Sequence, residues 1–506
     1  MMTTFIAFGL ALFLGLAVLA LLRANAAKLG FLDNPDGRRK LHAKPVAVVG
    51  GLGLFVTVLS STALLAWLDP SVAPLFVADG QRFAWLGVAS ILIVSLGAID
   101  DRFNLRARFK LLGQIAASLV LVLGGNYVIP SVSLLGHSFE FGAFAMPITV
   151  LWFLAAMNAM NLLDGMDGQL GTLGLIMFSA LGILFFLIGN TLSGYMAFIF
   201  VGSLLAFLTM NYPPATVYMG DAGSMFLGLI IAALAIQTSV KGAAVSILAP
   251  MTLLVLPFID TVAAILRRKL TGRSLAMSDR AHLHHILLKR GLSIPQALLV
   301  VAGFAIIAAV GAVVSVVYQQ DWIAVATAAS VVAGLLLTGL FGRAETKLLQ
   351  SRVGAMLNSA MTRSDNMEME VRLQGSIRWE HVWDELTKQA ITLNLTGIQL
   401  DVNAPIWHEG YHRRWLARGT KPDPIKSWRV ELPLLGHGQV LGRLLVFGDR
   451  GVECIGDKLL ALSEMTRRVE LLAAEATLEM AEASSGHTPV TPGKQATATT
   501  RLDPVT

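Results

Sequence analysis

The residues best suited to chemistry are carboxylates and amides that stand where apolar runs end. The stretch GAIDDRFNLRARFKLLGQ, 97–114, places Asp100 beside Asp101, with Asn104 three residues on and Lys110 at the start of the next apolar run. Two adjacent carboxylates repel each other unless a cation or a hydrogen-bond donor neutralises them. An isolated pair of this kind would most simply be a solvated helix end, so the motif has to be interpreted together with others.

A polar ladder follows in NAMNLLDGMDG, 158–168, where four ligand-type side chains recur at every third position: Asn158, Asn161, Asp164 and Asp167. On a helix or a tighter turn, side chains at this spacing neighbour one another along one side. Gly165 and Gly168 each follow a carboxylate directly, which indicates that the backbone bends there and lets another group approach closely. A plain loop with two Asp-Gly turns would not need four such side chains.

A third motif is NYPPATVYMGDAGSMFLG, 211–228, in which Asp221 precedes small residues at the start of an apolar run. A carboxylate at a helix N-terminus can be a cap that contributes about 1 kcal/mol. The same helix start, with its backbone N–H groups exposed, is also typical of a seat for a phosphate or a metal phosphate.

Three histidines lie in the basic stretch SDRAHLHHILLKRG, 278–291, namely His282, His284 and His285. Closely spaced histidines can bind zinc, but no Cys or Glu completes a ligand set there. Arg280 and the other basic residues alongside favour hydrogen bonding to a phosphate or a nucleotide. A weaker group, 34–53, combines basic residues at 38–40, which could attract anionic lipid heads or a nucleotide diphosphate, with Gly50, Gly51 and Gly53, which indicate close helix packing.

The elements that must position these motifs are membrane helices. The chain is 55% hydrophobic and only 14% charged, whereas a soluble domain is about 25% charged. Apolar runs long enough to cross a bilayer predict an all-α polytopic domain over 1–342 with about eleven spans, near 3–23, 47–67, 83–99, 111–128, 145–160, 172–189, 194–210, 224–238, 245–265, 297–318 and 322–341.

Lys and Arg are unevenly divided between the two sets of connecting loops. One set holds the basic residues near 28–44, 102–110 and 267–290, whereas the opposite set offers only Arg82 and Lys241. The positive-inside rule places the first set and the C-terminal region in the cytoplasm. We expect the N-terminal helix to stay uncleaved and to begin outside. The only cysteine, Cys454, lies in the C-terminal region, so a disulfide within one chain is excluded.

From about residue 343 the composition becomes that of a soluble segment. The stretch 371–390 has the periodicity of an amphipathic helix, GIQLDV, SWRVELPLL and VLGRLLVFG alternate as strands do, and 458–482 is typical of a closing helix. We therefore predict a small cytoplasmic α+β domain over 343–482 and a disordered tail over 483–506, which is rich in Ser, Thr, Pro and Gly.

The five carboxylates of the motifs all stand at predicted span ends on the cytoplasmic side, and we expect no charge in the middle of a span. Carboxylates and amides are hard oxygen ligands suited to Mg²⁺, with Mn²⁺ as a substitute, and Mg²⁺ takes its other ligands from substrate phosphates and water. A basic rim would hold those phosphates. The residues therefore predict a Mg²⁺-dependent phosphoryl transfer at the cytoplasmic interface, with one substrate from water and one from the membrane.

Over about 1–342, the motifs GAIDD, NAMNLLDGMDG, PATVYMGDAGSMFLG and HLHH, in this order, resemble those of the polyprenyl-phosphate N-acetylhexosamine-1-phosphate transferases, glycosyltransferase family 4. The form HLHH is similar to that of the undecaprenyl-phosphate GlcNAc-1-phosphate transferases rather than to the phospho-MurNAc-pentapeptide translocases. The resemblance implies transfer of a HexNAc-1-phosphate from a UDP-sugar to undecaprenyl phosphate in the plasma membrane, with release of UMP, to start a cell-surface polysaccharide. It also implies a homodimer, and no nucleic-acid partner.

The resemblance also implies residue roles. It makes Asp100 and Asp101 the acidic pair that takes the proton of the lipid phosphate or helps to hold the metal, and Asp221 the Mg²⁺ ligand. It assigns Asn158, Asn161, Asp164 and Asp167 to the site of the nucleotide sugar and the metal. It assigns His282, His284, His285 and Arg280 to the UDP diphosphate or the sugar, and Lys110 to the neighbourhood of the diphosphate.

Three other functions fit parts of the sequence. A translocase-type activity differs in the sugar donor only. A membrane transporter would use carboxylates near the bilayer midplane on repeated, broken helices, and neither feature is evident. A degenerate membrane anchor with a working C-terminal domain is disfavoured by the complete motif set.

Overall fold

The computed structural model describes residues 2–33, 45–134, 137–241, 247–270, 282–341, 367–374, 379–404, 409–417, 427–436 and 439–449, and a few residues between 463 and 471. The chain divides into two compact units, Met1–Gln350 and Ser351–Thr506. The first unit is helical, and the second is a small sheet with a helix.

Within the described residues, nine helices are long and apolar enough to cross a membrane, so the protein is a multi-pass membrane protein. They are α1 (Met2–Leu29), α2 (Gly50–Leu68), α4 (Gly80–Phe103), α5 (Ala107–Leu119) with the π-helix η1 (Val120–Gly124), η2 (Gly142–Phe144) with α6 (Ala145–Leu163), α7 (Gln169–Leu187), α8 (Thr191–Asn211), α9 (Gly220–Lys241) and α13 (Ile294–Tyr318).

The two remaining predicted spans form shorter helices. The stretch 245–265 is divided at Leu254 into α10 (Leu248–Leu253) and α11 (Val255–Leu270). Pro250 and Pro257 lie on either side of this break, and proline removes a helical N–H donor. The last span is α14 (Asp321–Leu337), which has 17 residues. Two further short helices are α3 (Ala73–Ala78) and α12 (Leu283–Lys289).

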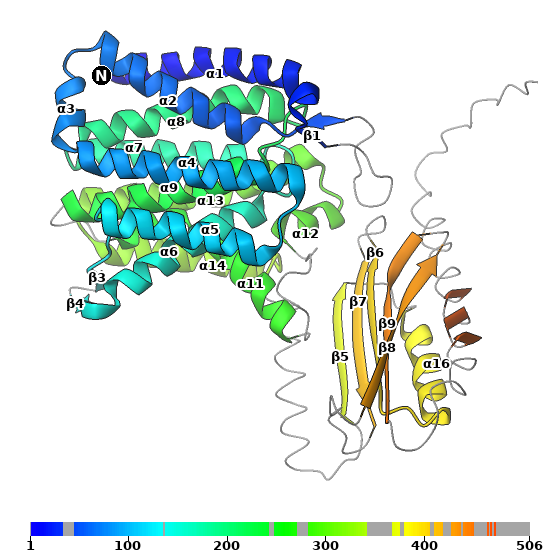
Figure 1. Cartoon of the computed structure of the whole chain (residues 1–506). Helices are drawn as coiled ribbons and strands as arrows, with labels where there is room; N and C mark the ends of the chain where they lie inside the picture. Colours follow the sequence, from blue (N-terminus) through cyan, green and yellow to red (C-terminus); the bar gives the residue numbers. More distant parts are fainter. Residues whose placement is uncertain are drawn as a thin grey trace, which may run out of the picture. The chain divides into compact units, whose positions relative to one another are not determined.

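Helix α9 is the centre of the first unit, and nearly all of its apolar stretch is buried. Helices α2, α4, α6 and α7 pack around it (Figure 1). Glycines permit the closest approaches: a Cβ on Gly97 of α4 would lie 2.3 Å from Ala222 Cα, and a Cβ on Gly51 of α2 would lie 2.1 Å from the Gly223 nitrogen. Since neither contact leaves room for a side chain, the predicted role of the glycines near residue 50 in helix packing is confirmed.

Two pairs of short antiparallel strands lie in connections between the helices. β1 (Leu32–Asp33) pairs with β2 (Val46–Ala47), and β3 (Ser131–Leu134) pairs with β4 (His137–Glu140), both antiparallel. The segment before α2 also binds the segment before α9, because Ala47 O accepts from Tyr218 N at 2.8 Å and Tyr218 O accepts from Gly50 N at 2.9 Å. The starts of α2 and α9 are therefore held side by side.

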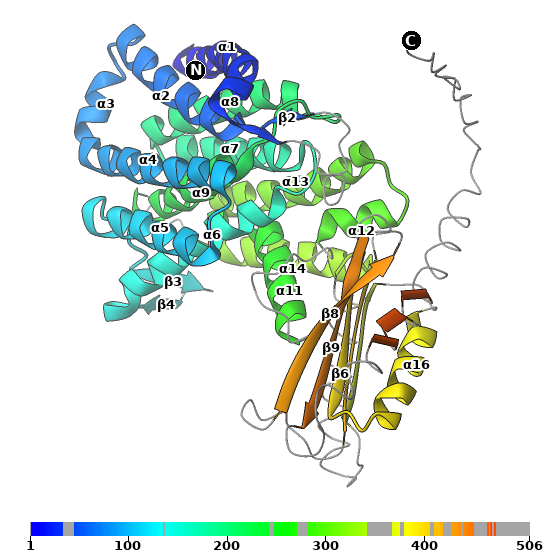
Figure 2. The same ribbon diagram turned by 45° about the vertical axis from the view of Figure 1, so that its right-hand side comes forward.

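The second unit is an antiparallel sheet with the strand order β5-β7-β6-β9-β8. Helix α16 packs against β6 and β7 (Figure 2). Its Trp379 and Trp383 are buried with strand residues such as Leu400. The elements are β5 (Met367–Gln374), α16 (Trp379–Thr392), β6 (Gly397–Ala404), β7 (Glu409–Leu416), β8 (Ser427–Gly436) and β9 (Gln439–Asp449).

The predicted α+β character of the second unit is confirmed, with two corrections. The helix predicted from residue 371 is wrong at its start, because 371–374 belong to β5 and the helix begins at Trp379. Strand β7 was not predicted, because adjacent arginines in HRRWL hide the alternation of Tyr411, Arg413 and Trp415. The few described residues of the predicted closing helix, between 463 and 471, are helical, and the predicted tail from 483 lies outside the described residues.

Candidate active site

The polar motifs meet at one end of the helical unit. The end of α4, the start of α5, the end of α6, the start of α9 and helix α12 all lie at the right-hand end of the bundle in Figure 1. The chain alternates direction from span to span, so motifs far apart in sequence come together there.

The centre of this site is an ion cluster of Asp100, Lys110 and Asp221. The Lys110 ammonium forms an ion pair with Asp100 Oδ2 and lies 2.5 Å from Asp221 Oδ2. The remaining oxygens also accept hydrogen bonds, Asp221 Oδ1 from Asn161 Nδ2 at 2.9 Å and Asp100 Oδ1 from the Leu105 N–H at 2.7 Å. The Lys110 and Asp221 side chains keep 29% and 24% exposure, so a substrate can reach them.

Asp101 faces the backbone of α9 instead of the ion cluster. Its Oδ1 accepts from the Asp221 N–H at 2.7 Å and its Oδ2 accepts from the Ala222 N–H at 3.2 Å. A carboxylate at a helix N-terminus satisfies N–H groups that the helix leaves open. Asp101 thus occupies two of the backbone donors at the helix start where the sequence predicts a cap or a phosphate seat.

The four side chains of the polar ladder contact different parts of the fold and do not bind one common partner. Asn161 joins the ion cluster, whereas Asn158 Nδ2 donates to Gln114 Oε1 of α5 at 2.8 Å. Asp167 Oδ2 accepts from the Ala215 N–H at 2.9 Å, so it fastens the turn after α6 to the segment before α9. Gly168, with φ of 77°, donates its N–H to Asn211 Oδ1, as the predicted bend requires.

Asp164 ends α6 and is the ladder member with the most altered acidity. Burial, reinforced by the negative charges of Asp221 and Asp101, raises the pKa of Asp164 to about 8. The Gly220 N–H donates a hydrogen bond to the Asp164 carboxyl group and opposes this rise. A carboxyl group of this kind can hold or release a proton near neutral pH.

The three histidines divide into different surroundings. His282 Nδ1 lies 2.8 Å from Asp260 Oδ2, and the His282 and His284 rings are stacked with centroids 6.0 Å apart. His284 is 2% exposed, and burial lowers the pKa of its imidazole well below the usual value.

A Cβ on Gly165 would lie 2.6 Å from His284 Cε1, so the predicted close approach at Gly165 is confirmed and its partner is this ring. His285 is partly exposed on α12 with its ring 4.2 Å from that of His284, and Arg280 lies outside the described residues.

One carboxylate outside the motifs and three neutral residues within them were assigned no role from the sequence. Asp260 of α11 is fully buried, and it lies inside the predicted span 245–265, toward its predicted cytoplasmic end, where no charge was named from the sequence. The apolar stretch VLPFIDTVAAIL around it was the available signal, because an ionised group there is costly without a partner. The neutral partners are Gln114, Asn211 and Ser224, whose Oγ accepts from Asn161 at 2.9 Å.

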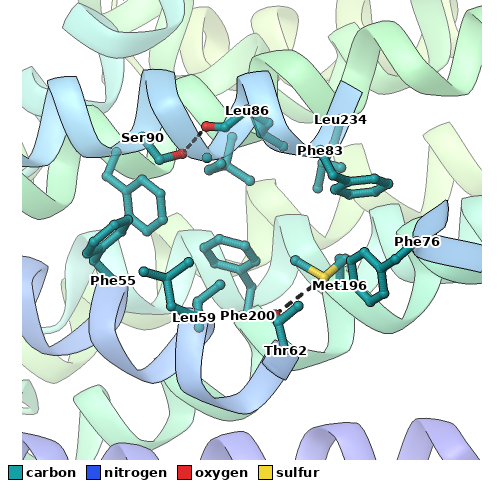
Figure 3. Close-up of a pocket in the computed structure, with 14 residues that line it drawn as sticks. Phe55, Leu59, Thr62, Phe76, Phe83, Leu86, Ser90, Met196, Phe200 and Leu234 are labelled. Carbon is teal, nitrogen blue, oxygen red and sulfur yellow. Dashed lines mark hydrogen bonds between the residues drawn. The ribbon is translucent and has the colours of Figure 1, made fainter. Parts of the chain in front are cut away.

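An apolar cavity lies apart from the ion cluster, between α2, α3, α4, α8 and α9 (Figure 3). Its volume is about 120 Å³, and Phe55, Phe83 and Phe200 are among its walls. The close contact of Gly97 with Ala222 stands between this cavity and the ion cluster. The cavity is therefore no part of the charged site.

No group of three or more His, Cys, Asp or Glu side chains in the described part of the chain is arranged around a common metal position. The oxygens of Asp100 and Asp221 do converge on one positive charge, that of Lys110. These two carboxylates are therefore the donors on which a divalent cation could bind together with substrate phosphates.

Comparison with known proteins agrees with this site. The family described as glycosyl transferase family 4 matches residues 83–239, which include the ion cluster and the polar ladder. A probable undecaprenyl-phosphate N-acetylglucosaminyl 1-phosphate transferase of Bacillus subtilis is 32% identical over 61% of this chain and 84% of its own length. An undecaprenyl-phosphate alpha-N-acetylglucosaminyl 1-phosphate transferase of Haemophilus influenzae is 32% identical over 64% of this chain and 89% of its own length.

A decaprenyl-phosphate N-acetylglucosaminephosphotransferase of Mycobacterium tuberculosis is 34% identical over 62% of this chain and 83% of its own length. The relatives thus match most of their own length, and more than a third of this chain lies outside each match. By these similarities the chain belongs to glycosyl transferase family 4, the family of the polyprenyl-phosphate N-acetylglucosamine-1-phosphate transferases that its motifs resemble.

Proposed function

We propose that the protein transfers GlcNAc-1-phosphate from UDP-GlcNAc to undecaprenyl phosphate, giving a lipid pyrophosphate sugar and UMP, as the first step of a cell-surface polysaccharide. The observation that carries this proposal is the convergence of Asp100, Lys110 and Asp221 at the ends of three membrane helices. A lipid phosphate and a soluble diphosphate can meet at such a place. The names of the relatives support the same acceptor class and the same sugar.

The reaction would proceed by direct displacement. An oxygen of the lipid phosphate attacks the β-phosphorus of UDP-GlcNAc and forms a new P–O bond, while the bond from that phosphorus to the UMP oxygen breaks. UMP leaves with the bonding electron pair. Phosphoryl transfer of this kind depends mainly on positioning and on neutralising charge. Retention at the transferred phosphorus instead of inversion would indicate a two-step route through a phosphorylated aspartate.

Each residue of the site has a proposed part in this displacement. Lys110 binds the diphosphate and stabilises its negative charge, and Asp100 accepts the proton of the lipid phosphate. Asp101 holds the start of α9 so that Asp221 faces the site. Asn158, Asn161, Asp164 and Asp167 shape the pocket for the nucleotide sugar, and the histidines, with Arg280, bind the diphosphate or the sugar.

Mg²⁺ is the proposed cofactor, with Mn²⁺ as a substitute. The donor set fits it, because Asp221 and Asp100 supply two carboxylates that already converge on one cation, with the Asn161 side chain beside them. When bound, the ion would neutralise charge on the diphosphate and on the leaving UMP. Lys110 would then be released from the carboxylates to bind phosphate oxygens.

The proposed orientation places the site in the cytoplasm of the cell and the protein in the plasma membrane. Basic residues gather at the site end of the bundle, among them Arg102 and Arg106 near α4 and Arg267–Lys269 at the end of α11. The positive-inside rule favours the cytoplasm for this end. We further propose eleven spans, nine long helices plus the α10–α11 pair and α14, with the C-terminal unit inside, and a homodimer.

A transfer assay with labelled donors tests the function. Purified protein in lipid nanodiscs is incubated with undecaprenyl phosphate, Mg²⁺ and labelled UDP-GlcNAc, UDP-GalNAc or UDP-MurNAc-pentapeptide, and label is counted in the lipid phase. We expect label from UDP-GlcNAc alone, lost with EDTA and restored by Mg²⁺. Asp221→Asn should abolish the transfer. Asp69 follows the last residue of α2, at the end of that helix away from the site, and Asp69→Asn should leave the transfer unchanged. Label from UDP-MurNAc-pentapeptide, or none from any donor, would contradict the proposal.

A further inference from the structure

The most deeply buried carboxylate near the site is Asp260, which none of the motifs contains. Its side chain is fully buried in α11, in the stretch 255–266, where every residue except Asp260 and Thr261 is apolar. Burying an ionised group without partners costs much more than a buried hydrogen bond returns. Replacing a buried ionic pair with apolar residues is often neutral or stabilising, so stability alone gives no reason to have a carboxylate at this position.

Both oxygens of Asp260 bind the start of the histidine helix. Oδ2 lies 2.8 Å from His282 Nδ1, and Oδ1 accepts from the Leu283 N–H at 3.0 Å. Leu283 is the first residue of α12, so one carboxylate fixes the first turn of the helix and the plane of the His282 ring. A carboxylate acceptor at Nδ1 places the proton on that nitrogen and leaves Nε2 as the ring atom for a ligand.

The same helix carries His284 against the turn that follows α6. The His282 and His284 rings are nearly parallel, at 6°, and Gly165 leaves only enough room for the His284 ring. Gly165 directly follows Asp164, whose carboxyl group accepts from the Gly220 N–H beside Asp221. A continuous series of contacts therefore joins Asp260 to the ion cluster through α12 and the turn after α6.

We propose that Asp260 is a positioning residue for the transfer reaction, an inference that rests on the proposed function. It holds His282 with Nδ1–H toward the carboxylate and Nε2 toward the diphosphate of the nucleotide sugar. It also keeps α12 at the distance at which His284 packs on Gly165. Asp260 touches neither substrate nor metal, and it acts through His282.

A double-mutant cycle tests this role. Asp260→Asn keeps an oxygen that can accept from the Leu283 N–H, but it removes the charge that orients Nδ1–H of His282. We expect turnover to fall roughly 10- to 100-fold, as for other residues that orient a functional histidine. In a His282→Asn background, Asp260→Asn should cause no further loss beyond about twofold, because residues that act through one another are not additive.

A matched control and a second readout separate this role from a loss of folding. Thr252→Val in α10 removes another buried polar group, one that bonds only backbone carbonyls, and should leave turnover unchanged. Melting temperatures of all variants are measured in parallel. If Asp260→Asn melts too low for assay, Asp260→Glu replaces it in the cycle: it keeps the charge but displaces the carboxylate from His282 Nδ1, and wild-type turnover in this variant would overturn the inference.

The outcomes are separable from those of the proposed function. Normal turnover in Asp260→Asn, or independent losses that multiply in the double variant, would overturn the inference. Wild-type protein that transfers label from no donor would overturn the proposed function alone. In that case the readout is the rise in melting temperature that UDP causes by binding the folded protein. Asp260→Asn should make this rise smaller. A rise as large as in the wild-type protein would overturn the inference.

Discussion

The same three helices, α2, α4 and α9, pack in opposite ways in two regions of the membrane unit. At the site end their backbones touch, Gly51 against Gly223 and Gly97 against Ala222. Farther along, the helices separate and leave the apolar cavity of Figure 3, where among the described residues no heavy atom outside the local backbone of α4 lies within 4 Å of the Cβ position of Gly87. Between Gly97 and Gly87, ten residues apart on α4, the helix thus changes from close backbone contact with α9 to a position that borders the cavity.

The difference follows the charges. At the site end, Asp101 must reach two backbone N–H groups of α9, and Lys110 must reach two carboxylates at once. These contacts depend on fractions of an ångström, so the helices that carry them must be fixed. In the cavity the walls are apolar, and the hydroxyl group of Ser90 already donates to Leu86 O. We infer that packing is most exact where charges must be neutralised and is relaxed where only hydrocarbon is exposed.

Among the variants that test this contrast, the largest expected effect comes from loss of the positive charge in the ion cluster. Lys110→Met leaves Asp100 and Asp221 without their common cation and removes a donor to the diphosphate. Turnover should fall about 10²- to 10³-fold in the transfer assay, as for the loss of other donors that stabilise developing charge. Arg108→Met removes a charge from the same helix, where Arg108 lies over the Phe109 ring, and should keep most of the activity. Equal losses in both variants would contradict a specific role of Lys110.

The second effect is on the tight contact itself. A methyl group at Gly97 would lie 2.3 Å from Ala222 Cα, and because this is backbone, α4 and α9 must move apart. Gly97→Ala should separate Asp101 from the Asp221 N–H and lower turnover roughly 10- to 100-fold, since a shift of 1 Å can cost about 10²-fold. The transfer assay measures this, with melting temperature to confirm folding. Retained activity would mean that the contact is not needed.

A smaller effect is expected where a ring, and not backbone, limits the space. Gly165→Ala would push the His284 ring, whose Cε1 lies 2.6 Å from the added methyl position. Because α12 can shift slightly, we expect a loss of about tenfold in turnover. The matched control is Gly303→Ala in α13, where no described atom beyond the local helix backbone lies within 4 Å of the Cβ position. A loss in the control as large as in Gly165→Ala would show that the His284 contact is not the cause.

A pH effect on stability follows from the same ring. Burial lowers the pKa of His284 well below 6.5, so between these two values the unfolded chain binds a proton that the folded chain does not. Stability therefore falls as pH drops below 6.5, by at most about 1.4 kcal/mol for each pH unit. His284→Gln should remove this contribution. Thermal unfolding at pH 7.5 to 5 measures it, and identical slopes in both proteins would contradict the assignment.

The sequence predicted the site better than it predicted the contacts within it. Spacing and residue type indicated Asp100, Asp221 and the polar ladder, because charged and amide side chains are rare in apolar runs. Spacing could not separate Asp100, which binds Lys110, from its neighbour Asp101, which binds the start of α9. That division depends on the direction in which each side chain leaves α4, and on a helix more than a hundred residues away.

The parts that escaped prediction depend on tertiary contacts. Asp260 is a single carboxylate in an apolar run, and only the fold brings His282 to it. The ninth predicted span is divided at Leu254, although its apolar composition is continuous. In the C-terminal unit, strands with clear alternation, such as β6, were predicted, whereas β7 was not, because its arginines lie among the buried residues Tyr411 and Trp415.

The smallest effect tests the relaxed region directly. Gly87→Ala adds a methyl group where the described part of the chain has no heavy atom within 4 Å beyond the local backbone of α4, and alanine favours a helix over glycine by roughly 1 kcal/mol. The variant should therefore be more stable by about 0.5 to 1 kcal/mol, seen as a small rise in melting temperature, with unchanged turnover. It differs from Gly97→Ala only in position along α4. If Gly87→Ala loses turnover as Gly97→Ala should, then added volume is equally harmful at both positions of α4. The contrast between the two regions would then fail.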